Sequence, residues 1–469
     1  MPDALLSSYI NALPDPRNVA VVETHISWVL LAGDFAFKIK KPVTLPFLDY
    51  GTAERRRACC AEELRINRRF APDLYLEVVE LAAPSGNEPA VKMRRFADEA
   101  RLDRVCALGD LTGAQLSVFA RDLAELQAAA AVPPEPTFGS PATVLADALE
   151  NFAELKALMP GEADFLARLE GWTRAEFARR ETDFARRRRQ GRVREGHGDL
   201  HLGNLVLLDG RIVPFDAIEF NARFRCIDVA SEVAFTLLDL LEHGRPGLAG
   251  WLLSEWLDYS GDHDALAVLR FYLVYRAMVR AKVAALQGRP EECARYLAFA
   301  ARLVVPHALA LTITCGPSGC GKTRAASRRL ATADFLHTVR IRSDVERKRL
   351  FGLAPDAASD GSIYTPAATL RTYAHLGELA ERAIGAGWSV IVDAAFLKRA
   401  ERDAFRQLAR RLGATFAILA PTAAPGEMRR RLAARQGDAS EATPDILERQ
   451  LAWFEPPDAT AGETGVTSA

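Results

Sequence analysis

The segment "GPSGCGKT" (316–323) constrains the fold of this chain more than any other stretch. It matches the pattern G-x-x-x-x-G-K-[ST], whose backbone N–H groups surround a phosphate and which needs a buried strand before it and a helix after it. The nearly all-apolar "LALTITCG" precedes the loop, and a helical pattern follows it. We therefore expect the whole loop to bind nucleotide phosphates. Its residues are Gly316, Pro317, Ser318, Gly319, Cys320, Gly321, Lys322 and Thr323.

Within this loop, Lys322 is expected to contact the β and γ phosphates and Thr323 to contact Mg²⁺. The buried strand pattern "WSVIVDAAF" (388–396) supplies Asp393 as a second magnesium ligand. A motor-type ATPase usually has an acidic residue directly after this aspartate to activate water, whereas this chain has Ala394. The pattern thus favours a kinase over a motor.

A second signature, "EGHGDLHLGN" (195–204), lies in the other half of the chain. Phosphoryl transfer needs positioning, charge neutralisation and a group that accepts the proton of the acceptor hydroxyl. Protein kinases provide these with H-R-D-L-x-x-x-N and a later metal-binding aspartate. Asp199 here corresponds to the proton acceptor, Asn204 to a magnesium ligand, and Asp216 of "VPFDAIEF" to the later metal ligand.

A lysine on a strand of the small lobe should reach the phosphates and pair with a glutamate on a helix. The segment "AFKIKK" offers Lys38 and Lys40, which point to the same face of a strand. Lys38 is the preferred candidate and Lys40 the alternative. The glutamate is Glu62 or Glu63 of "CAEELRIN", and the spacing does not decide between them.

Hydrophobic patterns divide the 469 residues into two domains. Strand patterns followed by long helices predict an α+β domain over 1–305, with a small lobe at about 1–100 and a helical lobe at about 101–305. Alternating strands and helices predict an α/β domain with a parallel sheet over 306–456. Residues 457–469 read as a disordered tail.

The motifs of the first half bring a family resemblance. The segments "HGDLHLGN", "PFDAIEFN" and "CIDVASEVAF" resemble the aminoglycoside phosphotransferase family of small-molecule kinases. The resemblance implies a protein-kinase-like bilobal fold with Asp199 as catalytic base and Asn204 and Asp216 as magnesium ligands. It also implies that Asp228 supports the catalytic loop.

The second half resembles P-loop small-molecule and polynucleotide kinases, including relatives of zeta toxin and of chloramphenicol phosphotransferase. The resemblance lies in "RIRSDVERKRLFG" (340–352) and "MRRRLAARQGDASEATPDILERQ" (428–450). It implies that Asp344 binds the acceptor or acts as base, and that Arg431 and Arg435 belong to a lid over the transferring phosphate. The chain as a whole resembles bacterial proteins described as bifunctional aminoglycoside phosphotransferase/ATP-binding proteins.

Composition limits which partners and which cell compartment we expect for the protein. The formal net charge of −1 does not favour nucleic acid or an anionic membrane as a partner. Seven cysteines without metal-ligand spacing, no signal-peptide pattern and no long apolar run predict a cytoplasmic protein. The expected cofactors are ATP and Mg²⁺.

Three hypotheses follow. The first is an enzyme with two ATP-binding domains that transfers the γ-phosphoryl group to a hydroxyl of a small molecule. The second is a protein with one catalytic domain and one nucleotide sensor. The third is a toxin-type kinase of polynucleotides or nucleotide sugars, for which affinity for single strands that falls with salt is the discriminating observation.

Overall fold

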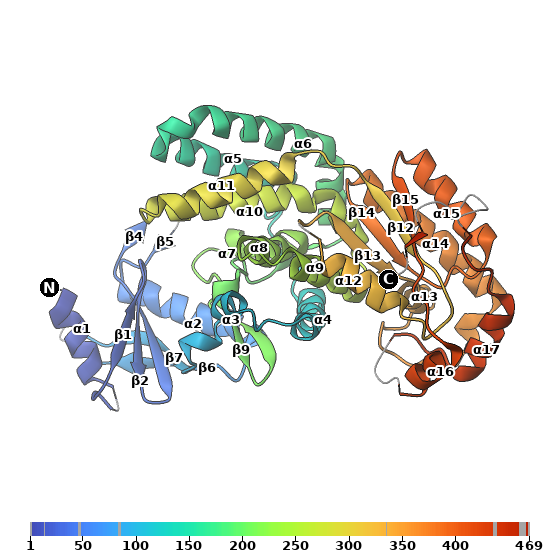
Figure 1. The fold of residues 1–469 in the computed structure, drawn as a ribbon. Coiled ribbons are helices and arrows are strands. Elements are labelled where there is room, and N and C mark those ends of the chain that lie inside the picture. The colour runs from blue at the N-terminus through green and yellow to red at the C-terminus, as the bar shows by residue number, and fades with distance from the viewer. Residues whose placement is uncertain are drawn as a thin grey trace. The chain divides into compact units, whose positions relative to one another are not determined.

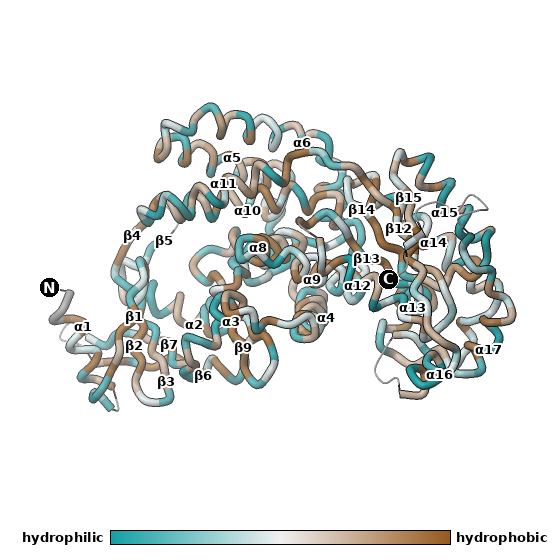
Figure 2. The backbone as a smooth tube through the Cα atoms, viewed as in Figure 1, coloured by the Kyte–Doolittle hydropathy of each residue, from teal (hydrophilic) through white to brown (hydrophobic). Residues whose placement is uncertain are grey.

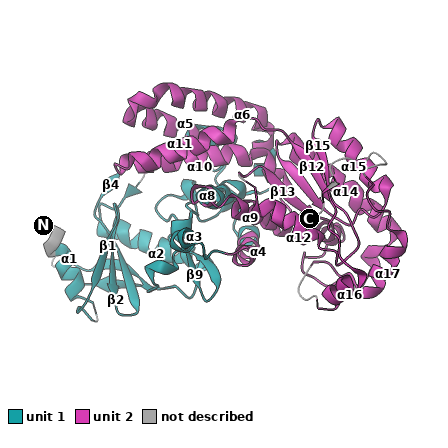
Figure 3. Cartoon of the chain, viewed as in Figure 1, with its two compact units in different colours: residues 1–111, 126–146, 185–239 teal, residues 112–125, 147–184, 240–469 magenta. Residues whose placement is uncertain are grey.

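The structure, a computed structural model, describes residues 2–13, 15–45, 48–82, 86–333, 335–434, 439–458 and 466–467. These residues form two compact units, which Figure 3 shows in different colours. The first unit comprises residues 1–111, 126–146 and 185–239, and the second comprises residues 112–125, 147–184 and 240–469. The second unit thus contains the P-loop together with helices from the region 101–305, and the domain bounds 1–305 and 306–456 stay a prediction. In the part of the chain described, no helix is both long and apolar enough to cross a bilayer.

An antiparallel sheet of five strands forms the small lobe of the first unit (Figure 1). The strands run in the order β1-β2-β3-β7-β6. Gly33, with φ of +56°, and Asp34 form the two-residue turn between β2 and β3. The bounds are β1 (Ala20–Glu23), β2 (Ser27–Ala32), β3 (Phe35–Lys40), β6 (Tyr75–Leu81) and β7 (Glu88–Arg94), with a small hairpin of β4 (Thr44–Leu45) and β5 (Leu48–Asp49).

Helix α2 (Ala53–Phe70) packs on strands β6 and β7 of this sheet. Thr52 caps its first turn, because the Thr52 side chain accepts a hydrogen bond from the Arg55 N–H. The buried positions recur every three or four residues, so they share one helix face. This face includes Cys60, Glu63, Asn67 and Phe70. The polar residues Glu63 and Asn67 on this buried face need hydrogen-bond partners inside the fold.

The catalytic-loop signature of the sequence lies between two short antiparallel pairs. Strand β8 (Val193–Glu195) pairs with β11 (Cys226–Asp228), and β9 (Leu205–Leu208) pairs with β10 (Arg211–Pro214). The β9–β10 turn is Asp209-Gly210, and both residues have positive φ, +49° and +78°. This Asp-Gly turn is typical of a tight hairpin. The Phe215 N–H donates to the Asn204 carbonyl at 3.0 Å, so the hairpin brings Asn204 next to Asp216 in space.

Helices make up most of the chain between these elements and the second sheet. The Asp-Gly hairpin is preceded by the short 3-10 helix η3 (Leu202–Asn204). The helices before the second sheet are α1 (Pro2–Asn11), α3 (Leu102–Leu108), α4 (Gly113–Ala129), α5 (Pro141–Leu158), α6 (Ala163–Arg189), α7 (Ala222–Arg225), α8 (Val229–Glu242), α9 (Pro246–Ser260), α10 (Leu266–Leu286) and α11 (Pro290–Val304).

A parallel sheet in the order β13-β14-β12-β15-β16 forms the core of the P-loop region. Its central strands are almost fully buried, and the brown colour along β12 in Figure 2 marks its hydrophobic residues. The strands predicted before the P-loop and at 388–396 are both present. The strands are β12 (Ala310–Thr314), β13 (Thr338–Arg342), β14 (Ser389–Asp393), β15 (Thr415–Leu419) and β16 (Val466–Thr467). The helices are α12 (Lys322–Ala331), α13 (Ser343–Leu350), α14 (Pro366–Gly385), α15 (Arg399–Arg411), α16 (Pro425–Ala433) and α17 (Pro444–Trp453).

Strand β16 belongs to the segment 457–469, for which the sequence predicts a disordered tail. Val466 and Thr467 pair in parallel with Ile418 and Leu419 at the edge of the sheet. Residues 459–465, 468 and 469 lie outside the described residues.

Candidate active sites

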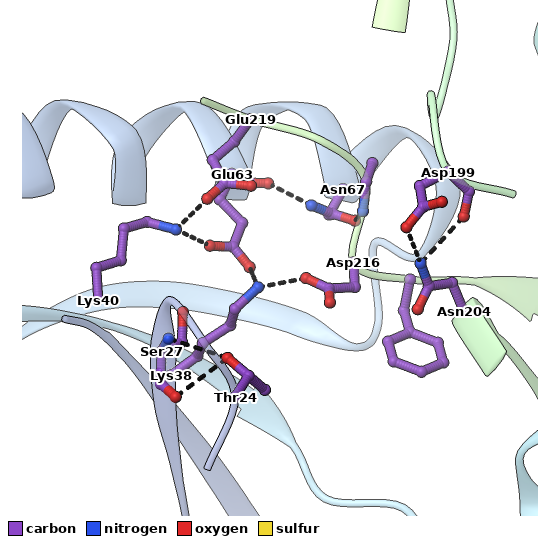
Figure 4. A network of polar contacts seen from close by, with 12 residues as sticks. Thr24, Ser27, Lys38, Lys40, Glu63, Asn67, Asp199, Asn204, Asp216 and Glu219 are labelled. Atoms are coloured by element: carbon purple, nitrogen blue, oxygen red, sulfur yellow. Dashed lines mark hydrogen bonds and ion pairs between the residues drawn. The ribbon is translucent and has the colours of Figure 1, made fainter. Parts of the chain in front are cut away.

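Two lysines of β3 converge on one glutamate of α2. Lys38 Nζ lies 2.8 Å from Glu63 Oε1, and Lys40 Nζ lies 2.7 Å from Glu63 Oε2 (Figure 4). The alternation of side chains along a strand places Lys38 and Lys40 on the same face. Glu62, the alternative partner, instead pairs with Arg65. The structure therefore brings together Glu63 and both candidate lysines.

Each lysine also has a second carboxylate, and the two carboxylates differ. Lys38 donates to Asp216, which follows the β9–β10 hairpin. Lys40 donates to Glu219, three positions further along, which also accepts a hydrogen bond from the Tyr50 hydroxyl. Lys38 is thus the lysine that contacts the predicted metal ligand.

The electrostatics of this cluster keep its members charged. Burial alone would lower the pKa of Lys38 and of Lys40, but the carboxylates around each lysine outweigh burial and raise both pKa values well above the usual value. Burial alone would raise the pKa of Glu219, but Lys40 and Lys38 lower that pKa to about 2. Burial and the Glu219 carboxylate raise the pKa of Tyr50, so Tyr50 remains a hydrogen-bond donor.

Asp216 has an unusual backbone conformation that its neighbours maintain. Its φ is +63°, a region that a non-glycine residue seldom adopts. The Asp216 N–H donates to the Tyr75 hydroxyl at 2.9 Å, and the Ala217 N–H donates to Asn67 Oδ1 at 2.9 Å. Asn67 in turn donates to the Glu63 carbonyl at 3.0 Å. The buried polar face of α2 therefore holds the metal-ligand segment in place.

The loop of the first signature brings Asp199 and Asn204 into direct contact. Asn204 Nδ2 donates to the Asp199 carbonyl at 3.0 Å and to Asp199 Oδ2 at 3.1 Å (Figure 4). These bonds orient the Asp199 carboxylate, which is partly exposed. The sequence-predicted base and one predicted metal ligand are thus adjacent on one short loop.

The buried carboxylate of Glu232, in α8, bonds the backbone of this loop. Glu232 accepts hydrogen bonds from the backbone N–H groups of His197 and Gly198 and from Gln127 Nε2. A Cβ atom at Gly196 would lie 2.3 Å from Glu232 Oε1, so this close approach requires glycine at position 196.

The role implied for Asp228 needs correction. Asp228 makes two hydrogen bonds of 2.8 Å with the buried guanidinium of Arg187 and accepts another from the Ala230 N–H. It therefore fixes the end of α6 to the start of α8, whereas Glu232 is the carboxylate that bonds the catalytic loop. Sequence reasoning missed Glu232 because it lies one helical turn beyond the aspartate that the family pattern marks.

The two histidines of the signature have structural contacts. His197 is fully buried, and burial lowers its pKa, so its neutral ring bonds the Phe215 carbonyl through Nε2 at 2.8 Å. His201 Nδ1 accepts the Gly203 N–H at 3.0 Å. Both contacts shape the segment that carries Asp199, Asn204 and Asp216.

The donor set of this first site fits magnesium and nucleotide phosphate. Carboxylate and amide oxygens are the protein ligands that Mg²⁺ takes, usually one or two of them together with phosphate oxygens. Asp216 and Asn204 provide one of each, and Lys38 provides an ammonium beside them. The sequence could not show that Glu219 and Tyr50 complete the cluster.

The second site is the P-loop between β12 and α12. Gly316, Gly319 and Gly321 have φ of +137°, +83° and +107°, which favour glycine. A Cβ atom at Gly319 would lie 2.8 Å from the Met428 carbonyl oxygen. Lys322 is the first residue of α12, and its Nζ donates to the Pro317 carbonyl at 2.9 Å. The loop thus has the backbone geometry that the motif predicts.

Two other loop residues differ from the simple expectation of phosphate contact. The Cys320 side chain is buried in a cluster with Met428, Leu432 and Leu447. The Ser318 N–H donates to Gln450 Oε1 of α17 at 2.7 Å. Ser318 and Thr323 both line a cavity of about 1190 Å³ at this edge of the sheet.

The carboxyl ends of neighbouring strands bring the other predicted residues to the same cavity. Asp393 is the last residue of β14, which pairs with the P-loop strand β12. Asp344 follows β13, which pairs with β14 on its other side. Thr314 Oγ1 lies 3.3 Å from Asp393 Oδ1 and accepts the Ala394 N–H at 3.0 Å. Burial raises the pKa of Asp344, although Arg342 opposes this shift.

The predicted lid lies partly within the described residues. Arg431 lines the cavity, and its Nη1 donates to the Gly319 carbonyl of the P-loop at 3.1 Å. Its Nε also pairs with Glu427 at 2.7 Å. Arg435, the other predicted lid residue, lies outside the described residues.

A family model and several solved structures match parts of this chain. A family model described as an AAA domain matches residues 311–457. A choline/ethanolamine kinase family protein from Mesorhizobium loti is 13% identical, with 65% of this chain and 95% of that chain covered and a TM-score of 0.40. An aminoglycoside 2′-phosphotransferase-IIIa is 12% identical, with 64% and 96% covered and a TM-score of 0.38. Kti12 from Chaetomium thermophilum, in complex with ADP-AlF3, is 17% identical, with 34% and 88% covered and a TM-score of 0.26.

The predicted combination of a protein-kinase-like part with a P-loop α/β part is confirmed by the matched AAA domain, the parallel sheet and the geometry of the first site. One full-length relative covers both parts. It is the uncharacterized protein Rv2004c of Mycobacterium tuberculosis (strain ATCC 25618 / H37Rv), 33% identical over 458 residues, which are 94% of this chain and 91% of the relative. This chain belongs to the same protein family as that mycobacterial protein.

Proposed function

We propose that this protein is an ATP-dependent phosphotransferase with two ATP-binding sites, each of which transfers the γ-phosphoryl group to a hydroxyl of a small molecule. The observation that carries the proposal is the position of Lys38. It contacts the helix glutamate Glu63 at 2.8 Å and also contacts Asp216. An ammonium between a helix carboxylate and a metal-ligand aspartate is the arrangement that kinases use on the phosphates of ATP.

In the first site, each residue has a separate task. Asp216 and Asn204 would hold Mg²⁺, which when bound neutralises charge on the phosphate oxygens. Lys38 donates to the phosphates, and the Glu63 carboxylate keeps the lysine in position. Asp199 accepts the proton of the acceptor hydroxyl while the hydroxyl oxygen forms its bond to phosphorus and the bond to ADP breaks. The Asn204 amide holds the Asp199 carboxylate in the orientation this proton transfer needs.

In the second site, the amides of residues 316–323 and the Lys322 ammonium bind the phosphates. Thr323 and Asp393 would hold Mg²⁺ there, and both line the same cavity. Asp344 follows β13, which is separated from the P-loop strand β12 by β14. It lines the same cavity, where it accepts the proton of the acceptor hydroxyl. Arg431 connects the lid helix α16 to the P-loop. Ala394, directly after Asp393, favours transfer to an acceptor over hydrolysis.

The test is ATP turnover by the full-length protein against fractions of a bacterial metabolite pool, with Asp199→Asn and Lys322→Ala measured in parallel. We expect acceptor-dependent ADP formation that one or both variants remove, and a phosphorylated product detectable by mass spectrometry. The variant that removes turnover assigns the reaction to its half. If ATP binds and no fraction yields a phosphorylated product, the protein is a nucleotide sensor and the proposal is wrong.

A further inference from the structure

Helix α9 contacts an edge strand of the parallel sheet of the P-loop region. Strand β13 is the first in the order β13-β14-β12-β15-β16, so one of its edges pairs with no other described strand. The Arg340 N–H donates to Ser254 Oγ of α9 at 3.0 Å. Gly247 of α9 allows a close approach, because a Cβ atom there would lie 2.5 Å from the Ala331 carbonyl oxygen of α12. Figure 1 shows α9 beside β13 and α12. The contact therefore joins α9 to the strand that leads to Asp344.

Two carboxylates of α9 share one guanidinium of β13 in this contact. Arg340 Nη2 lies 2.5 Å from Glu255 Oε1 and 3.4 Å from Asp258 Oδ2. At most 9% of each of these three side chains is exposed. The guanidinium Nη1 donates to the Ser327 hydroxyl at 3.2 Å, and Nε has no hydrogen-bond partner among the described residues. One nitrogen of one cation therefore serves two buried carboxylates.

Asp258 is the less well paired of the two carboxylates. Its contact with Arg340 is the longer one, and its other oxygen, Oδ1, is buried with no hydrogen-bond partner in the part of the chain that the structure describes. A buried charge without a partner costs far more than a buried neutral group. Where two carboxylates share one site, the pKa of one of them is strongly raised. The geometry therefore favours a proton on Asp258 over a proton on Glu255.

The surroundings of Asp258 agree with this assignment. Burial raises the pKa of Asp258 to about 7, against the attraction of Arg340. The groups with smaller effects on this pKa are Glu255 and Glu346, which raise it, and Arg342, which lowers it. Arg349 donates to the backbone carbonyl of Asp258 and lies 3.2 Å from Glu346. The other titratable groups nearby are Tyr259, His263 and His375, and both histidines pair with Glu346. Arg349 and the histidines therefore bond atoms other than the Asp258 carboxylate oxygens.

We propose that Asp258 is a proton-binding site in the contact between α9 and β13, and that this contact weakens when Asp258 releases its proton as the pH rises through neutrality. Ionised Asp258 would place a second negative charge beside Glu255, with Arg340 as the shared cation. Strand β13 ends at Arg342, and Asp344 follows two residues later and lines the cavity. The strand that leads to the proposed base of the P-loop site is thus held by a contact that responds to pH.

Asp258→Asn has nearly the shape of the protonated side chain and does not titrate, so it is the reference for the test. In the folded protein the pKa of Asp258 is raised from 3.8 to about 7. A raised pKa contributes stability that is fully present below the unfolded pKa and is lost as the pH rises through the folded pKa. Relative to Asp258→Asn, the equilibrium constant for opening of β13 in the wild type should therefore rise about tenfold per pH unit between about pH 5 and 7. It should stay constant above about pH 7.5.

The measurement is hydrogen exchange of the β13 amides in the full-length protein, corrected for the intrinsic exchange rate at each pH. Asp264→Asn is the matched control, because Asp264 pairs with the exposed Arg382 at 3.3 Å. An exposed pair contributes little, so the ratio of wild type to Asp264→Asn should change less than about threefold over the same range.

Glu255→Gln is the second test variant. It leaves Arg340 to Asp258 alone, so Asp258 should stay ionised and the rise between about pH 5 and 7 should disappear. This variant also preserves the test if Asp258→Asn fails to fold, because the wild type can be compared with it directly.

The proposal is overturned if the ratio of wild type to Asp258→Asn stays constant between about pH 5 and 7, because Asp258 then binds its proton equally well in the closed and open states. It is also overturned if Asp264→Asn gives the same rise, or if Glu255→Gln keeps the full rise. Hydrogen exchange needs no substrate, so these outcomes do not depend on the proposed kinase function.

Discussion

Lys40 donates a hydrogen bond to Glu219 at a place where neither side chain is appreciably exposed. The bond joins β3 to the segment that follows the β9–β10 hairpin. Glu219 is three residues beyond Asp216, so this buried pair fixes the segment whose first carboxylate contacts Lys38. The Lys40–Glu219 pair therefore has a structural task, which supports Lys38 as the lysine proposed to bind the phosphates.

Removal of both partners of this buried pair should cost less stability than the two single removals added together. Lys40→Met leaves Glu219 without its cation, and Glu219→Gln leaves Lys40 with Glu63 alone. Such single variants typically lose about 3–5 kcal/mol, because an uncompensated charge stays buried. The double variant Lys40→Met/Glu219→Gln should be more stable than the sum of the single effects predicts. Urea unfolding, read locally by hydrogen exchange of residues 27–40, measures the three values.

Additive effects of the two substitutions would contradict the ion pair. Lys41→Met is the matched control, because Lys41 pairs with the exposed Glu23. Its effect should stay below about 1 kcal/mol.

The same pair predicts how stability depends on pH. The pKa of Glu219 falls from its usual 4.5 to about 2 in the folded protein. A lowered carboxyl pKa contributes stability that is present above the unfolded pKa and is lost as the pH falls through the folded pKa. The contribution is about 3 kcal/mol, lost between roughly pH 4.5 and 2. The stability difference between wild type and Glu219→Gln should therefore shrink as the pH falls through this range.

Denaturant unfolding at several pH values measures that difference, and a difference that stays constant from pH 6 to pH 2 would contradict the assignment. Comparison with Glu219→Gln at each pH is essential, because other carboxyl groups titrate in the same range. The pKa of Glu346, for example, is also lowered, against the effect of burial, by hydrogen bonds from His263 and His375.

The sequence predicted those residues of the first site that lie in patterns of fixed spacing. Asp199, Asn204 and Asp216 belong to one loop and one hairpin, so their chain positions nearly determine their neighbours. The choice between Glu62 and Glu63 could not be made, because it depends on which face of α2 packs on the sheet. Glu219 and Tyr50 stayed unpredicted for a related reason, since Lys40 and Glu219 are 179 positions apart.

In the second half, the sequence predicted the P-loop and the strands that flank it, because a buried parallel strand reads as a short apolar run. The strand pattern at 388–396 also led to Asp393, and the family resemblance implied Asp344; both residues follow the carboxyl ends of strands, as functional residues of such sheets often do. The burial of Arg347 in α13 could not be predicted. In the sequence, Arg347 and Arg349 are two arginines of one charged helix, and only the packing of α13 shows that Arg347 is the buried one.

Two separate nucleotide sites should appear in calorimetry. The full-length protein has the Lys38–Asp216 cluster in one unit and the P-loop in the other. A non-hydrolysable ATP analogue with Mg²⁺ should therefore bind with a stoichiometry near two. Lys322→Ala and Lys38→Ala should each lower the stoichiometry by one, because each removes a different site. A wild-type stoichiometry of one would show that only one of the two sites binds nucleotide.

Asp199 and Asp216 should differ in what they contribute. Asp199, the proposed base, is held by Asn204, whereas Asp216, a proposed metal ligand, contacts Lys38. Loss of a positioned general base typically costs about 10²–10⁴-fold in rate. Asp199→Asn should lower turnover of the first site by about this factor with little change in ATP affinity, and Asp216→Asn should also weaken binding of Mg·ATP. Measuring ATP affinity together with turnover distinguishes the two roles. Equal losses of ATP affinity in the two variants would refute the assignment.

The lid offers a matched pair of arginines on one helix. Arg431 donates to the Gly319 carbonyl of the P-loop, whereas Arg429 pairs with Glu448 at the surface. Lid closure excludes water and brings positive charge to the transferring group, so hydrolysis without acceptor should be slow. In an Asp199→Asn background, which silences the first site, Arg431→Ala should remove roughly 10²-fold of the acceptor-dependent acceleration. Arg429→Ala should leave it within about twofold, and both variants should bind ATP normally through Lys322 and the loop amides. Rapid turnover that needs no acceptor and is insensitive to Arg431 would instead identify this half as a motor or a switch.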